Sequence, residues 1–96
     1  MEFSEGAFED LVGVRLFERR RILEAIETQL GDLPTRETRN RKQLRGLVPP
    51  FEAVQPIWEL RVGVYRVFYD VEEEGHRVYV RAIRRKPPSK RTEEIL

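Results

Sequence analysis

Cysteine is absent from this chain of 96 residues, and histidine, tryptophan and methionine each occur once. Without cysteine there is no disulfide, no thiolate nucleophile and no cysteine-based metal site, which fits a reducing cytosol. No apolar run approaches the roughly 18 residues that a membrane-spanning helix needs. The first residues also lack a basic stretch followed by an apolar one, so no secretory signal is expected. We expect a cytoplasmic protein with a single domain over residues 1–96.

A large net charge is missing as well, because 18 basic and 17 acidic residues leave only +1. The charges are nevertheless segregated along the chain. Residues 77–91 hold seven basic side chains and no acid, and residues 36–45 form a second basic cluster in which Glu37 is the one acid. Such a pattern suits a polyanion or an acidic protein segment, although ordinary solvated charge on a small domain would produce it too.

Two helices are predicted in the first third of the chain. Ser4 can cap a short helix that Gly13 interrupts. A longer helix is expected from about Arg15 to Leu30, with Gly31 as its stop signal. Helical spacing assigns four side chains to the buried face and one basic triplet to the outer face: Leu16, Leu23, Ile26 and Leu30 inside, and Arg19, Arg20 and Arg21 outside.

Residues 32–56 show no clear period and contain four of the six prolines. A loop of this length inside a small domain is uncommon without a function. It either packs through Leu44, Leu47 and Phe51 or carries a binding role.

Three strands with alternating apolar and polar residues are predicted over 58–62, 65–71 and 78–83. Gly63 and Val64 form a two-residue turn with glycine first, the type II′ preference. The second turn, from Glu72 to His76, is polar, and His76 is read as an exposed turn residue. With Phe3 starting a fourth, short strand, the pattern predicts an α+β fold in which a helical hairpin packs on one face of a small twisted antiparallel sheet.

The first turn sets the register, so that Val62 faces Tyr65, Arg61 faces Arg66, and Glu59 faces Phe68. One sheet face is then apolar and is expected to cover the helices: Trp58, Leu60, Val62, Tyr65, Val67, Tyr69, Val78, Val80 and Ala82. The opposite face is expected to be exposed and is the candidate site: Glu59, Arg61, Arg66, Phe68, Asp70, Tyr79, Arg81, Ile83 and Arg85.

The segment 58–70, with the sequence WELRVGVYRVFYD, resembles the sheet signature of RelE/ParE toxins, which belong to bacterial type II toxin–antitoxin systems. Residues 39–47 look like the basic segment that precedes this sheet, and residues 78–86 resemble its last strand. The resemblance implies the two-helix α+β fold, a cognate antitoxin as protein partner, and no cofactor or metal. It also implies one of two activities, since many members cleave messenger RNA, often on the ribosome, whereas ParE-type members inhibit DNA gyrase.

RNA cleavage requires an activated 2′-hydroxyl, stabilised phosphorane charge and a protonated 5′-oxygen. Arg66 matches the phosphate-binding arginine of ribonuclease members, and Arg61 is its cross-strand neighbour; two adjacent cations suit an anion that both can bind. Lys86 matches another functional basic position, and Glu59 is the one acid considered as general base. Glu59 departs from the lysine of the best-studied ribosome-dependent member, and Thr92 stands about where some members carry a base-stacking aromatic. Six further residues are predicted to bind RNA: Arg41, Lys42, Arg45, Arg81, Arg84 and Arg85.

Structural roles compete with these assignments, because Arg66 could pair with Glu59 or Asp70, and Glu59 is more often a salt-bridge partner than a base. Three functions therefore remain: a metal-independent ribonuclease, a ParE-like gyrase inhibitor that cuts nothing, and a degenerate member that only binds its antitoxin.

Overall fold

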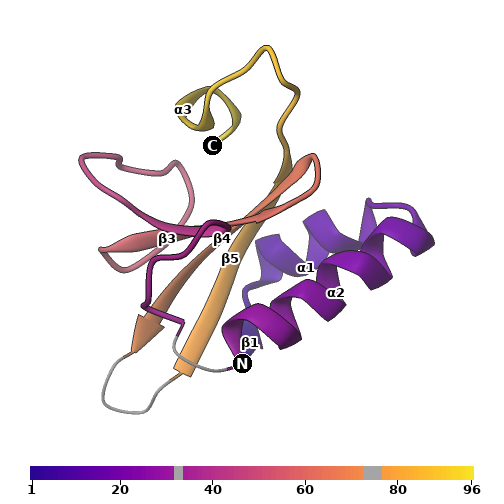
Figure 1. The fold of residues 1–96 in the computed structure, drawn as a ribbon, viewed down its shortest axis with the longest axis horizontal. Helices are drawn as coiled ribbons and strands as arrows, with labels where there is room; N and C mark the ends of the chain where they lie inside the picture. The colour runs from indigo at the N-terminus through magenta and orange to yellow at the C-terminus, as the bar shows by residue number, and fades with distance from the viewer. Residues whose placement is uncertain (32–33, 73–76) are drawn as a thin grey trace.

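The chain forms one mixed sheet with a helical hairpin on one side (Figure 1). The computed structural model describes residues 1–31, 34–72 and 77–96, so His76 lies outside the described residues. The sheet order is β1-β5-β4-β3-β2, with β1 parallel to β5 and all other neighbours antiparallel. The elements follow in the order β1 (Glu2–Phe3), α1 (Glu5–Val12), α2 (Leu16–Leu30), β2 (Arg41–Leu44), β3 (Ile57–Val62), β4 (Tyr65–Glu72), β5 (Arg77–Arg85) and α3 (Thr92–Ile95).

The predicted α+β class, the meander β3–β4–β5 and the short strand at Phe3 are confirmed. Strand β2 was not predicted, because its sequence RKQL carries a single apolar residue and shows no alternation. It forms by pairing with β3, where Arg41 lies opposite Leu60 and Leu44 opposite Ile57. The segment 32–56, which was predicted to be a loop, therefore contains a strand of the sheet, β2.

The helical hairpin is fixed at both of its ends. Ser4 caps α1, since its hydroxyl accepts a hydrogen bond from the backbone N–H of Ala7. Arg19 of α2 donates to the carbonyls of Leu11, Val12 and Val14 at 2.9–3.1 Å, which satisfies groups left open where α1 ends. Arg19 is thus part of the hairpin turn, and only the other two arginines of the triplet are exposed as predicted.

The buried face of α2 differs in part from the prediction. Ile26 and Leu30 are buried as expected, but Ile22 is the third buried residue of the helix. Leu16 and Leu23 are exposed. Because Ile22, Ile26 and Leu30 follow one i, i+4, i+8 row, the helix presents that narrow row to the sheet and turns the other two leucines outward.

The main core lies between this hairpin and one face of the sheet. The first strand hairpin has the predicted register, with Val62 opposite Tyr65 and Arg61 opposite Arg66. Gly63 has a φ of +58°, which the tight turn of a strand hairpin requires and which glycine adopts without steric cost. The buried members of the core are Ala7, Leu11, Ile22, Ile26, Leu30, Trp58, Leu60, Val62, Val67, Tyr69, Val78, Val80 and Ile83.

A bulge in β5 reverses the predicted faces beyond it. Phe68 lies opposite Ala82 and Tyr69 opposite Val80, so Arg81 is an extra residue in β5. Past this point the alternation shifts by one residue. The predicted faces of Ala82, Ile83 and Arg85 are therefore wrong: Ile83 enters the main core, Ala82 faces the other side, and Arg84 takes the place on the site face that Arg85 was expected to hold.

The other face of the sheet carries a second core, so the prediction that this face is exposed is wrong. Leu44, Ile57, Phe68 and Ala82 form a buried cluster. In Figure 1 the loop between β2 and β3 and the C-terminal segment with α3 lie on the side of the sheet away from the hairpin. Five side chains from these two covering segments pack on the cluster, which confirms that the loop packs through Leu47 and Phe51: Leu47, Phe51, Ala53, Ile95 and Leu96.

Candidate functional site

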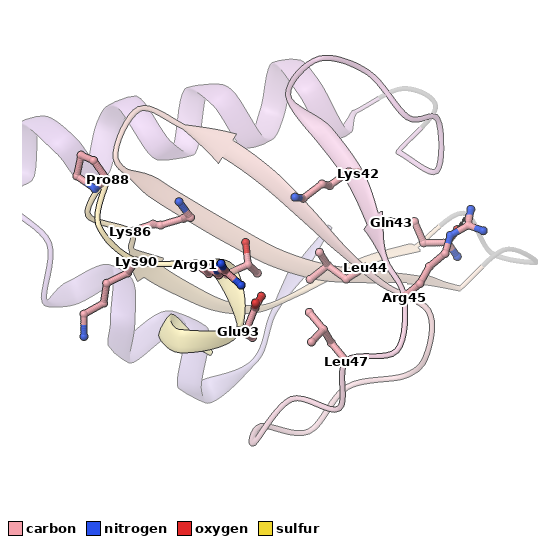
Figure 2. Close-up of a pocket in the computed structure, with 11 residues that line it drawn as sticks. Lys42, Gln43, Leu44, Arg45, Leu47, Lys86, Pro88, Lys90, Arg91 and Glu93 are labelled. Carbon is pink, nitrogen blue, oxygen red and sulfur yellow. Dashed lines mark hydrogen bonds between the residues drawn. The ribbon is translucent and has the colours of Figure 1, made fainter.

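A basic groove opens between β2 and the C-terminal segment, here residues 86–96, with a volume of about 770 Å³. Five cationic side chains line it, against one acid among its described lining residues, Glu93. Two cations come from the β2 side and three from the C-terminal segment, so the two basic clusters of the sequence meet here. The five are Lys42, Arg45, Lys86, Lys90 and Arg91 (Figure 2).

Strand pairing positions the two lysines that point toward each other in Figure 2. Lys42 lies on β2 opposite Glu59 of β3, with its Nζ 3.7 Å from Glu59 Oε1. Lys86 directly follows β5, and its backbone N–H donates to the carbonyl of Val64 at 2.6 Å. Two prolines come next and provide no N–H for further pairing, so the chain leaves the sheet at the groove.

Glu59 lies beneath the groove and is only 5% exposed. Its Oε2 accepts a hydrogen bond of 2.7 Å from the hydroxyl of Thr92, which is also buried. With Lys42 at its other oxygen, this carboxylate joins β2, β3 and α3. The predicted pairing of Glu59 with an arginine is not found among the described ion pairs, where Lys42 takes that place.

A row of three arginines crosses the sheet two residues nearer to the Gly63 turn than Glu59. Arg61 lies opposite Arg66, and Arg66 lies opposite Arg84. This arginine row (Arg61, Arg66 and Arg84) is about 7 Å along the strands from the Lys42–Glu59 pair. Like charges side by side repel, so the row is an unfavourable arrangement for the isolated chain and a favourable one for a bound anion.

Arg66 is the most buried member of the row at 7% exposure. Its Nη1 donates to the carbonyls of Gly63 and Tyr65 at 2.9 and 2.8 Å. Burial lowers the pKa of Arg66, Glu59 opposes that change, and Arg61 adds to it. Among the described residues, Arg66 makes no ion pair within 4 Å, so neither predicted carboxylate partner binds it directly.

The other two members of the row differ in exposure. The side chain of Arg61 is exposed. Arg84 donates to Asp10 of α1 and lies over the ring of Phe51, with 5.8 Å from its Cζ to the ring centroid. Asp10 therefore neutralises the charge of Arg84 at one end of the row, whereas Arg61 at the other end is exposed and can contact a ligand.

Three of the arginines predicted to bind RNA point away from the groove. Arg41 is buried and donates to the carbonyl of Gln29 at the end of α2. Arg81, the bulge residue, forms a two-pronged ion pair with Asp70 at 2.7 and 3.2 Å. Arg85 is exposed opposite Tyr65, on the side of the helices. The structure thus gathers Lys42, Arg45 and Lys86 in the groove and Arg61, Arg66 and Arg84 in the row.

Sequence reasoning assigned no role to Lys90, Thr92 and Glu93. The signal that could have placed them is Pro87-Pro88 followed by Arg91 and Glu94, since the Glu94 carboxylate accepts a hydrogen bond from the Arg91 backbone N–H at the start of a short helix. In the part of the chain that is described, no group of three acidic or histidine side chains is arranged to hold a metal ion, and no helix is long and apolar enough to cross a membrane.

A helical hairpin packs behind a mixed sheet, and a basic groove lies on the opposite face, which together define a small α+β protein. The family model of the ParE toxin of type II toxin–antitoxin systems, parDE, matches residues 1–86. The chain therefore belongs to this toxin family, within the RelE/ParE superfamily.

A solved structure has the same fold. The chain is similar to one in the crystal structure of the archaeal RelE–RelB complex from Pyrococcus horikoshii OT3, with a TM-score of 0.67, 20% identity and 94% of each chain covered. No curated protein sequence matches. The resemblance drawn from the sequence is thus confirmed at the level of family and fold.

Proposed function

We propose that this toxin inhibits translation by cleaving messenger RNA in the basic groove, most effectively when the message is held on the ribosome. The observation that carries the proposal is the charge of the groove: five cations and one acid line it, and the arginine row lies beside it. Guanidinium and ammonium groups bind phosphate oxygens through charge-assisted hydrogen bonds. The overall charge of +1 would not by itself attract RNA, so the local field of the groove supplies the attraction.

In the proposed reaction the 2′-hydroxyl attacks the neighbouring phosphorus and the bond to the 5′-oxygen breaks. A cyclic phosphate forms on one fragment, and the proton lost by the 2′-hydroxyl is balanced by one gained at the 5′-oxygen. Arg61 and Arg66 stabilise the charge that develops on the phosphorane. Lys86, which lines the groove and lies two residues after Arg84, binds the same phosphate and can protonate the leaving oxygen.

We also propose a cognate antitoxin as the protein partner. The similar RelE chain comes from a complex with RelB, which supports a partner of that kind. The helical hairpin exposes large apolar side chains that a partner helix could cover. They are Phe8, Val12, Leu16 and Phe17. A product of the neighbouring gene that does not copurify with this chain would contradict this part of the proposal.

Inhibition of DNA gyrase is the second candidate, and two observations favour it. The matching family model is that of ParE toxins. In addition, Glu59 is buried and bound by Thr92 and Lys42, so the acid proposed as general base is not free in this conformation. In that case the basic groove would bind a protein surface or DNA and would cut nothing.

The deciding experiment is induction of the chain alone in a bacterial host, followed within minutes by mapping the 5′ ends of transcripts. New ends inside reading frames that disappear in Arg66→Ala support the ribonuclease. Growth arrest with intact transcripts, altered plasmid supercoiling and an induced DNA-damage response support gyrase inhibition instead. Normal growth without the antitoxin would mean a degenerate member and would overturn both.

A further inference from the structure

The C-terminal segment forms one wall of the basic groove. Six groove-lining residues belong to it, including three of the five cations, Lys86, Lys90 and Arg91. The groove therefore exists only while this segment is docked against the sheet. What holds the segment in place decides whether the five cations face a common space.

The segment has little structure of its own to hold it there. Its helix α3 is a single turn of four residues, and helices this short are unstable in isolation. Beyond the backbone hydrogen bond from Lys86 to Val64 at its start, two groups of contacts tie it to the rest of the molecule. Ile95 and Leu96 pack on the second core, and the hydroxyl of Thr92 donates to Glu59 Oε2 at 2.7 Å in a buried site.

We propose that the Thr92–Glu59 hydrogen bond is a latch that docks the C-terminal segment and thereby assembles the groove. Thr92 and Glu59 are then positioning residues for phosphate binding, and Glu59 serves as an anchor in place of the general base suggested by sequence. The inference rests on the proposed function only for its ligand, RNA, because docking itself can be measured without any ligand. A hydroxyl bonded to a carboxylate in a buried place is a strong contact, and its loss leaves the buried carboxylate without that donor.

The substitution Thr92→Val tests the effect of the Thr92–Glu59 hydrogen bond without changing the charge of the chain. It keeps the shape of the side chain, removes the hydroxyl and leaves the net charge unchanged. If docking weakens, the groove is complete in a smaller fraction of molecules, and the apparent affinity for RNA falls in proportion to that fraction. A loss of affinity in this variant cannot come from a change in the net charge of the chain.

The first measurement is limited proteolysis of the full chain by trypsin, whose cutting sites Lys90 and Arg91 lie in the segment. Cleavage requires local opening, so its rate follows the undocked population when opening is fast. We expect cleavage there to be roughly tenfold faster or more in Thr92→Val, on the scale of a lost hydrogen bond to a charged group. Thr92→Ser restores the hydroxyl and is expected to restore the slow rate.

The second measurement is the binding of a short single-stranded RNA to the same variants at several salt concentrations, followed by fluorescence anisotropy. Five docked cations predict a slope of about −3.5 in the logarithm of affinity against that of salt, and about −1.4 when only Lys42 and Arg45 remain in place. Thr92→Val is expected to weaken binding and flatten the slope. Glu93→Gln, which removes the groove acid and keeps the latch, is expected to strengthen binding.

Ile95→Ser provides an independent test, because Ile95 packs on the second core and does not line the groove. It is expected to reproduce both effects, with circular dichroism checking that the rest of the chain stays folded. Unchanged cleavage in Thr92→Val, or faster cleavage without any loss of RNA affinity, would overturn the latch. A wild-type chain that binds no RNA would instead refute the proposed function, while the cleavage rates would still decide whether the latch exists.

Discussion

Arg61 and Arg66 lie directly opposite each other on β3 and β4, although both carry the same charge. The guanidinium of Arg66 donates hydrogen bonds to the carbonyls of Gly63 and Tyr65 near the turn. These bonds keep the group in place, although burial removes it from water. Such an arrangement favours binding of an anion between the strands. The lowered pKa of Arg66 has the same origin, since burial and Arg61 both disfavour its charged form.

Replacing Arg66 with alanine is expected to reduce RNA cutting by about 10²- to 10³-fold, the usual effect of removing one charge-stabilising group from an active site. Mapped transcript ends and a cleavage assay with purified ribosomes measure this loss. Arg20→Ala, a change on the exposed face of α2, is the matched control for a lost arginine. Equal cutting by Arg66→Ala and the wild type would contradict the assignment.

The salt dependence of RNA binding should report single groove cations. Lys86→Gln is expected to make the slope of affinity against salt less negative by about 0.7, because one phosphate contact is lost for single-stranded RNA. Arg15→Gln removes an exposed charge at the start of α2, away from the groove lining, and should leave the slope unchanged. If both substitutions change the slope equally, binding is governed by total charge and the groove has no special role.

Gly63→Ala and Gly46→Ala should each destabilise the fold. Both glycines have positive φ, +58° and +73°, which costs an L-residue about 1 to 2 kcal/mol. At Gly63 the added Cβ would come within 2.9 Å of Arg21 Nη1, but this is the end of a flexible, exposed side chain that can move aside, and at Gly46 the Cβ would meet nothing within 4 Å. Urea unfolding measures both losses, and the loss at Gly63 should persist in an Arg21→Ala background because it comes from the backbone.

The buried phenol of Tyr69 is expected to make the free energy of unfolding depend on pH under alkaline conditions. Its hydroxyl donates to the carbonyl of Pro34 at 2.7 Å, and burial raises the pKa of this phenol above the ordinary value of 10.0, with Arg41 acting in the opposite direction. Because the folded state holds the proton more tightly, the stability from Tyr69 is full below pH 10.0 and falls as the pH rises above it.

The comparison with Tyr69→Phe isolates this contribution. At neutral pH the variant should be less stable by about 1 kcal/mol, since it lacks the hydrogen bond. Above about pH 10 the free energy of unfolding should fall with pH more steeply in the wild type than in the variant, by at most about 1.4 kcal/mol per pH unit. Urea unfolding at a series of alkaline pH values tests this, and parallel curves would contradict it.

The first strand hairpin was predictable because its register depends on local residues alone. A two-residue turn at Gly63 and Val64 fixes which residues face each other, and alternation fixes the faces. The family, too, could be identified from residues 58–70, since the matching toxin model covers them.

The bulge at Arg81 could not be predicted, because residues 78–83 alternate without interruption. Contacts from distant parts of the chain stabilise it. Asp70 binds the Arg81 guanidinium, and the hydroxyl of Ser4 donates to the Arg81 carbonyl across 77 positions of sequence. Strand β2 likewise forms by pairing with β3, and the four residues RKQL taken alone give no sign of this pairing.

The sequence predicted the charged residues of the candidate site but did not predict the groove that they line. The basic residues could be read from the sequence, whereas the packing of the β2–β3 loop and the C-terminal segment over this face of the sheet could not. That packing requires Thr92 to meet Glu59, 33 positions away, and Leu96 to reach a cluster built on Leu44 and Phe68. Such contacts leave no periodic signal in the sequence.

The sheet separates two cores that share its strands and no buried side chains. Substitutions in residues 45–56 or 86–96 can therefore reshape the groove while the helical hairpin and its packing stay as they are. The hairpin-backed sheet therefore forms a scaffold whose core does not include side chains from the loop or the C-terminal segment. A lineage could redirect such a toxin from one target to another by changing these two segments alone.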